Sequence, residues 1–152
     1  MRMLGLPLLG VLAVAAGCGA SASPSLTVRV EGTAARRSTS ACLFSIRANV
    51  AGGGRQTTCL TRVDGYPGPK ASMHSRGRMT FALPHGTLRA RVQIVQRFRA
   101  DGAHAKQTVS GTITGGSGRY AGARGTIRGG GAVVDSRSGL RGLDLVYRIA
   151  LG

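Results

Sequence analysis

Apolar and polar residues alternate along much of the chain. Every second side chain is apolar from Phe44 to Val50, and the same alternation runs from Leu88 to Ile94. Near the C-terminus it covers Leu143 to Leu151. A period of two is that of a β-strand with one face in a core and the other in solvent. These three segments are therefore predicted to be half-buried strands.

Five further strands are expected between and before these three. They lie at Leu26–Glu31, Gln56–Val63, Met73–Leu83, Lys106–Thr114 and Arg124–Asp135. Turn-forming residues such as Pro84-His85-Gly86 and Asp101-Gly102 separate them. No segment keeps a helical apolar stripe over three turns. The pattern predicts a single all-β domain over residues 26–152, an eight-stranded antiparallel β-barrel or, as the alternative, a β-sandwich.

The first residues are typical of an export signal. A short apolar run, Leu4 to Ala16, follows Arg2 and is too short to span a bilayer as a helix. Two outcomes remain open: residues 1–22 are a signal peptide cleaved after Ala22, or a lipobox-like sequence ends before Cys18, which is then lipidated. Both predict an extracytoplasmic protein, secreted or lipid-anchored to the cell envelope.

Export bears on the two remaining cysteines, Cys42 and Cys59. Such a pair usually bonds in an oxidising compartment, so a disulfide is predicted. A tight hairpin about Gly52–Gly54 would, however, place Cys42 opposite Asp64, several residues past Cys59. A disulfide needs α-carbons within about 7 Å. Either a bulge or wide loop offsets the pairing, or the two segments are not simple neighbours.

The charge and composition of the chain limit the kinds of partner that it is expected to bind. The chain has 21 Lys and Arg against 5 Asp and Glu, a formal charge of +16. This favours anionic partners such as envelope polymers or phospholipid head groups. Trp is absent and Phe and Tyr number three each, so few side chains can stack on bases, and nucleic acid is not the expected partner. His74, His85 and His104 have no partner at metal-ligand spacing, so no metal or cofactor is predicted.

Glycines gather between Gly111 and Gly131. The segment lacks the Lys-Ser/Thr pair of a phosphate-binding loop. Glycine permits positive φ and close approach of strands, which a small barrel needs at its corners. A structural loop is therefore predicted, and its glycines are Gly115, Gly116, Gly118 and Gly125.

The segment Gly115–Gly125, GGSGRYAGARG, resembles the signature GGTGxFxxARG of dirigent proteins and the wider allene oxide cyclase barrel-like group. Ser117 stands where Thr is usual, and Tyr120 where Phe is usual. The resemblance implies an eight-stranded antiparallel barrel in a secreted bacterial member of this group. It also implies that Arg124 belongs to the polar residues around a ligand cavity. A solvated surface arginine is the alternative for Arg124.

Two functions of different classes follow. In the first, the barrel binds a small apolar ligand in its lumen. If the barrel is an enzyme at all, the activity is of the isomerase, cyclase or dirigent kind, and none of Asp64, Asp101, Asp135 and Asp144 aligns with the family's acidic positions. The second is a cationic envelope protein whose outer face binds anionic polymers or phospholipid head groups. A cluster of basic residues favours it: Arg89, Arg91, Arg97 and Arg99.

Overall fold

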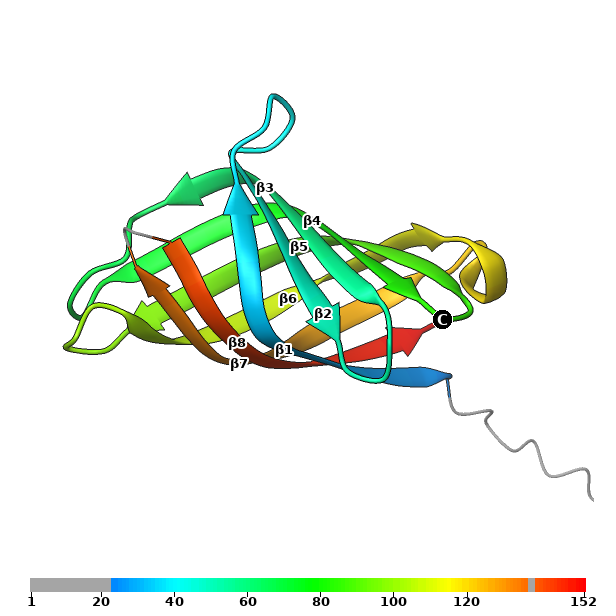
Figure 1. Cartoon of the computed structure of the whole chain (residues 1–152). Helices are drawn as coiled ribbons and strands as arrows, with labels where there is room; N and C mark the ends of the chain where they lie inside the picture. The colour runs from blue at the N-terminus through cyan, green and yellow to red at the C-terminus, as the bar shows by residue number, and fades with distance from the viewer. Residues whose placement is uncertain (1–22, 137–138) are drawn as a thin grey trace, which may run out of the picture.

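Eight antiparallel strands form a closed barrel in the computed structural model, which describes residues 23–136 and 139–152 (Figure 1). The strands are β1 (Ser25–Arg37), β2 (Phe44–Val50), β3 (Arg55–Asp64), β4 (Ser72–Leu83), β5 (Gly86–Phe98), β6 (His104–Gly116), β7 (Gly125–Ser136) and β8 (Gly139–Leu151). Each strand pairs with the next, and β8 closes the barrel on β1. The predicted all-β barrel is confirmed, and the sandwich alternative is excluded.

The predicted export signal, with Cys18 and the cleavage site after Ala22, lies outside the described residues. In the part of the chain that is described, no helix is long and apolar enough to cross a membrane.

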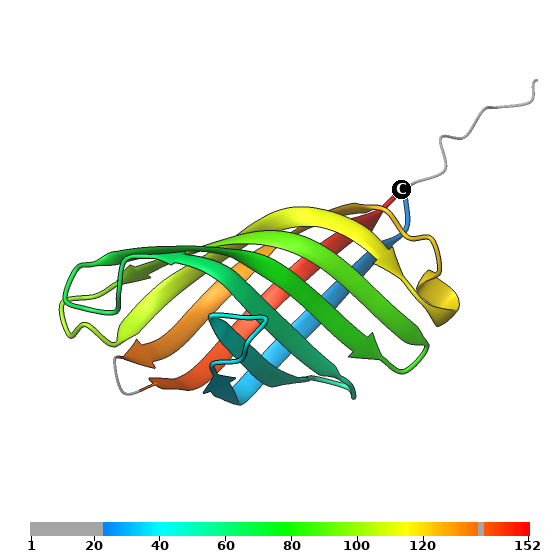
Figure 2. The same ribbon diagram turned by 90° about the horizontal axis from the view of Figure 1, so that it is seen from above.

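The connections alternate between the two ends of the barrel, because each strand runs opposite to the one before it. One end carries the β1–β2, β3–β4 and β5–β6 connections and is named here the Tyr66 end. The other carries the β2–β3, β4–β5 and β6–β7 connections, together with the start of β1 and the end of β8, and is named the Gly118 end (Figure 2). Segments Gly115–Gly125 and Gly65–Ala71 therefore lie at opposite ends.

Strand β1 is longer than its alternation predicts. The expected strand stops at Glu31, whereas the observed one continues to Arg37. Gly32 has a φ of 101°, and the pairing with β2 shifts register between Glu31 and Ala35. A bulge of this kind bends a strand without ending it. Beyond the bulge, Ala34 is buried and Arg36 half-buried, so both side chains lie on the inner side of the barrel.

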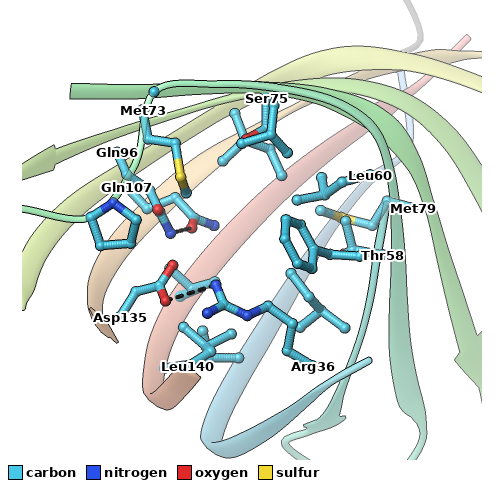
Figure 3. Close-up of a pocket in the computed structure, with 18 of the residues that line it drawn as sticks. Arg36, Thr58, Leu60, Met73, Ser75, Met79, Gln96, Gln107, Asp135 and Leu140 are labelled. Carbon is cyan, nitrogen blue, oxygen red and sulfur yellow. Dashed lines mark hydrogen bonds and ion pairs between the residues drawn. The ribbon is translucent and has the colours of Figure 1, made fainter. Parts of the chain in front are cut away.

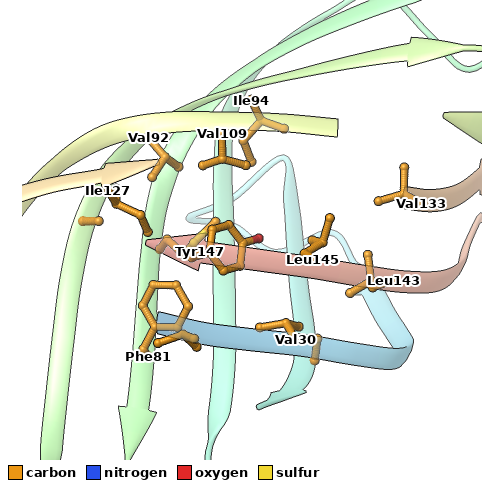
Figure 4. Packing of buried hydrophobic residues seen from close by; sticks show 14 of the residues in the cluster. Val30, Phe81, Val92, Ile94, Val109, Ile127, Val133, Leu143, Leu145 and Tyr147 are labelled. Carbon is orange, nitrogen blue, oxygen red and sulfur yellow. The ribbon is translucent and has the colours of Figure 1, made fainter. Parts of the chain in front are cut away.

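The interior of the Gly118 half is filled with large side chains. Several are less than 2% exposed: Val30, Phe81, Leu88, Ile127 and Ile149. The Phe81 ring meets that of Tyr147 edge-on, with centroids 5.5 Å apart and planes at 68° (Figure 4). Each fully buried side chain of this size contributes about 1.5–3 kcal/mol to folding. This half of the barrel is a solid apolar core.

Cys42 and Cys59 are disulfide-bonded, with α-carbons 5.3 Å apart, as predicted. The two strands are neighbours in a hairpin whose register pairs Ser45 with Cys59. Cys42 lies before β2 begins, in a turn where Thr39 accepts a hydrogen bond from its amide at 3.0 Å. This loop carries Cys42 back over β3 and supplies the offset that a tight hairpin lacks. The bond is consistent with an oxidising, extracytoplasmic location.

The glycine-rich corner joins β6 to β7 through a short 3₁₀ turn, Gly118–Tyr120. Gly118 has a φ of 58°, and a Cβ there would lie 2.6 Å from the carbonyl oxygen of His85. A Cβ on Gly116 or Gly125 would overlap neighbouring backbone as well. At Gly115 it would meet only the flexible Arg89 and Arg124 side chains, at 3.4 Å or more. The backbone of this corner thus requires glycine at three of the four positions named from the sequence.

Candidate ligand cavity

A cavity of about 250 Å³ occupies the Tyr66 half of the barrel. Its walls are mainly apolar (Figure 3) and include Leu60, Met73, Met79, Ile94, Leu140, Leu143 and Leu145. Tyr66 and Pro67 of the β3–β4 connection also line it, and Tyr66 is 61% exposed. The cavity therefore reaches the surface at this end, while Tyr147 separates it from the solid core.

Every buried polar side chain in the described residues faces this cavity. The six are Gln56, Thr58, Ser75, Gln96, Gln107 and Asp135. They come from strands β3 to β7 and occupy positions in the same alternation as their buried apolar neighbours. Burying a polar group is unfavourable unless it finds a partner. The Tyr66 half of the interior is therefore partly polar, whereas the Gly118 half is apolar.

The strongest polar feature is the pair formed by Arg36 and Asp135. Nη1 of Arg36 donates to Oδ1 of Asp135 at 2.9 Å (Figure 3). Nη2 of the same guanidinium donates to the carbonyl oxygen of Ser136 at 3.1 Å. The guanidinium also lies 5.1 Å from the centre of the Phe44 ring. Burial raises the pKa of the Asp135 carboxyl, although the Arg36 charge and the Gln96 side chain act to lower it. The carboxyl thus lies at the edge of an apolar space, where burial disfavours its charged form.

Two glutamines lie directly opposite each other on β5 and β6. Nε2 of Gln96 donates to Oε1 of Gln107 at 2.9 Å. Oε1 of Gln96 has no hydrogen-bond partner among the described residues, and neither has Oγ of Ser75. A buried polar atom without a partner typically costs about 1–3 kcal/mol. Both atoms belong to residues that line the cavity, although the atoms themselves are buried.

Gln56 and Tyr147 form the inner limit of the cavity. Nε2 of Gln56 donates to Oγ1 of Thr58 at 2.9 Å and lies 3.5 Å from the Tyr147 hydroxyl. Burial raises the pKa of that hydroxyl, so it stays protonated at neutral pH. Tyr147 therefore presents a hydrogen-bond donor to the hollow half while its ring packs in the solid half.

Arg124 lies elsewhere. It is exposed in the β6–β7 connection, and its Nη1 donates to the carbonyl oxygens of Thr114 at 2.8 Å and Ala123 at 2.9 Å. The connection belongs to the Gly118 end, whereas the cavity belongs to the Tyr66 end. Arg124 is consequently not part of the lining of this cavity. Arg124 thus occupies the position of a surface arginine, and its guanidinium is hydrogen-bonded to the backbone of the glycine-rich corner.

The residues that do line the cavity were missed as candidates, except that Asp135 was weighed among four aspartates. One signal for them exists in the sequence. Ser75 stands at an inward-facing position of its strand, between Met73 and Met79. Gln96 occupies the next inward-facing position after Ile94. A polar residue at an inward position of a barrel strand indicates a lumen that is not fully apolar.

The histidines do not join this site. His104 pairs with Asp101 at the surface, Nδ1 to Oδ2 at 2.6 Å. Across residues 23–136 and 139–152, no three His, Cys, Asp or Glu side chains come together as a metal site.

No family model, no curated protein and no solved structure matches the chain. The resemblance to the dirigent and allene oxide cyclase group therefore stays a prediction carried by the segment Gly115–Gly125.

Proposed function

We propose that the barrel binds a small, mainly apolar molecule bearing a polar group in the cavity of its Tyr66 half. One observation carries the proposal: all buried polar side chains of the described residues converge on this hollow, and two of them, Ser75 and Gln96, hold unpartnered atoms. Turned toward the cavity, Gln96 Oε1 would accept a hydrogen bond from a ligand hydroxyl or amine, and the Ser75 hydroxyl would exchange one with the same group. The apolar remainder would contact Met73, Met79 and Ile94.

The size of the cavity supports a ligand of modest dimensions. An engineered apolar cavity of about 150 Å³ is enough to bind benzene. The cavity here is about 250 Å³, which suits a molecule somewhat larger than one aromatic ring. A barrel interior shaped only for stability would be filled, because residual cavities and unpartnered polar atoms both destabilise the folded state.

The proposal also covers the location of the protein and its activity. The disulfide supports an extracytoplasmic protein, and the N-terminal sequence supports secretion or anchoring through Cys18. A dirigent- or cyclase-like activity would need a proton donor or acceptor beside the ligand. Asp135 is the carboxylate that the described residues offer for this role.

Titration with a neutral fluorescent probe of two fused rings, 1-aminonaphthalene, tests the binding proposal. Saturable one-to-one binding that changes little with added salt is expected, because apolar contacts are not screened. Ser75→Leu takes up part of the cavity and removes the hydroxyl, so it should weaken binding about tenfold or more. Ser72→Leu introduces the same side chain at an exposed position of the same strand and should leave binding intact.

Circular dichroism would establish that both variants are folded. Undiminished probe binding by Ser75→Leu would contradict the proposal. So would a wild-type signal that never saturates.

A further inference from the structure

A second feature lies on the outside of the barrel, where a groove crosses strands β3 to β6. The strand register aligns three rows of residues across it, namely Arg76–Gln93–Ser110, Gly77–Val92–Gly111 and Arg78–Arg91–Thr112. The outer rows point into solvent and form the walls. In the middle row two members are glycines and Val92 points inward, so backbone forms the floor. We name this feature the outer groove.

In the described part of the chain, the arginines of the outer groove form no ion pair with an acidic residue. All five acidic residues of the chain are engaged elsewhere: Glu31 and Asp144 with Arg29, Asp64 with Arg62, Asp101 with His104, and Asp135 with Arg36. Arg76, Arg78 and Arg91 are exposed. The Arg78 guanidinium makes only a weak contact, in which Nη2 lies 3.9 Å from Cys59 Sγ.

Arg78 and Arg91 stand directly opposite each other on β4 and β5. Like charges at directly opposed positions of a sheet destabilise it. Repulsion between the two guanidinium groups is therefore expected to lower the stability of the folded barrel. An anion bound between the two guanidinium groups would reverse that effect.

The groove also offers the partners that a phosphate group needs. A guanidinium presents paired N–H donors that match phosphate oxygens, and side-chain hydroxyls donate to the same oxygens. Ser110 and Thr112 supply hydroxyls on the β6 side. Neighbouring strands are about 4.8 Å apart and alternate residues about 6.6 Å apart along a strand. Charges at such intervals suit repeated anionic groups.

A second depression continues the outer groove past Arg78 and Arg91 to Arg89, with Thr57, Thr80 and Thr114 on its walls. The combined length exceeds a single phosphate. The exposed large apolar residues of the described chain, Leu43, Tyr66 and Val146, belong to neither depression. Proteins that lie on membranes insert such side chains beside their basic residues. The surface thus fits an extended chain better than a bilayer.

We propose that the outer groove binds a linear polymer carrying repeated phosphate groups, laid across β4, β5 and β6. The proposal is independent of the lumen ligand, because the groove residues point outward and the cavity residues inward. Failure of either one leaves the other intact.

The test uses the full chain and inorganic polyphosphate of defined length, followed by isothermal titration at several salt concentrations. Arg78→Gln/Arg91→Gln should weaken binding about tenfold or more and reduce the slope of log affinity against log salt by about 1–2. The matched control is Arg128→Gln/Arg148→Gln. It removes the same charge from another directly opposed pair, on β7 and β8 outside the groove. A loss of less than about threefold is expected there.

Three results would overturn the proposal. Equal losses in the two double variants would show that net charge alone attracts the polymer. Wild-type chain that binds orthophosphate as tightly as polyphosphate, or binds neither, would exclude a polymer site. Binding to vesicles of anionic phospholipid that depends on Arg78 and Arg91, without polyphosphate binding, would assign the groove to a membrane surface. Thermal unfolding should show both variants at least as stable as wild type.

Discussion

The guanidinium of Arg36 and the carboxylate of Asp135 meet at 2.9 Å although the two residues are 99 positions apart in the chain. The pair joins β1 to β7 across the inside of the barrel, past the intervening strand β8. The Asp135 side chain is 3% exposed and that of Arg36 17%. The two partners are therefore buried unequally, and the consequences of removing each one differ.

Removing Arg36 should destabilise the fold more than removing the charge of Asp135. Arg36→Met strands a carboxylate with almost no access to water, at a cost of about 3 kcal/mol. Asp135→Asn leaves a guanidinium that can turn toward solvent, so a smaller loss is expected. Arg36→Met/Asp135→Leu should recover most of the stability. Urea unfolding of the three variants measures the order, and a larger loss for Asp135→Asn would contradict it.

The pH dependence of stability should carry the signature of Asp135. Burial raises its pKa above the ordinary 3.8, so the folded chain keeps a proton that the unfolded chain has already released. The resulting stabilisation is present below pH 3.8 and is lost as the pH rises through the folded pKa. Relative to Asp135→Asn, the free energy of unfolding of the wild type should fall over this window.

Urea unfolding of the wild type and of Asp135→Asn at a series of pH values measures the difference between their free energies of unfolding. Hydrogen bonds from the backbone amides of Ala103 and His104, with the His104 side chain, hold the pKa of Asp101 at about 2. Asp101 is unchanged in both proteins, so its contribution cancels. A difference that stays flat with pH, or rises, would refute the assignment of a raised pKa to Asp135.

The strands could be predicted from the sequence because burial follows the period-two pattern directly. The alternation from Phe44 to Val50 matches β2 at both ends. Strand β1 was predicted too short, since the bulge at Gly32 interrupts the period while the hydrogen-bonded ladder resumes beyond it. The disulfide could be predicted because export leaves an even pair of cysteines, Cys42 and Cys59, in an oxidising compartment. Its geometry could not, because it depends on the turn at Thr39.

The cavity could not be predicted because its parts meet only when the barrel closes. Gln96 and Gln107 become neighbours through the register of β5 and β6, and Arg36 reaches Asp135 only across β8. Arg124 was singled out because it belongs to a recognisable motif. The alternation of connections between barrel ends then places that motif away from the hollow half. Local patterns predict which face a residue takes, whereas a site depends on register between distant strands.

The corner at Gly118 allows a test of backbone against side-chain effects. Gly118→Ala forces a Cβ into positive φ and against the His85 carbonyl, and should destabilise by about 1 kcal/mol or more. Gly115→Ala is the matched control, because its Cβ would meet only mobile guanidinium groups. Its effect should stay within about 0.5 kcal/mol. Thermal unfolding decides, and equal losses at the two positions would mean that the corner does not depend on positive φ.

Arg124→Ala separates the motif from the cavity. Its guanidinium bonds the carbonyls of Thr114 and Ala123 at an exposed site, so its removal should cost no more than about 1 kcal/mol. Binding of 1-aminonaphthalene in the lumen should be unchanged, because Arg124 lies at the Gly118 end. Gln96→Leu provides the comparison: it replaces the amide whose Oε1 is unpartnered, and should weaken that binding severalfold. If Arg124→Ala weakens probe binding as much as Gln96→Leu does, the ligand contacts the glycine-rich corner and the binding site is not the cavity described above.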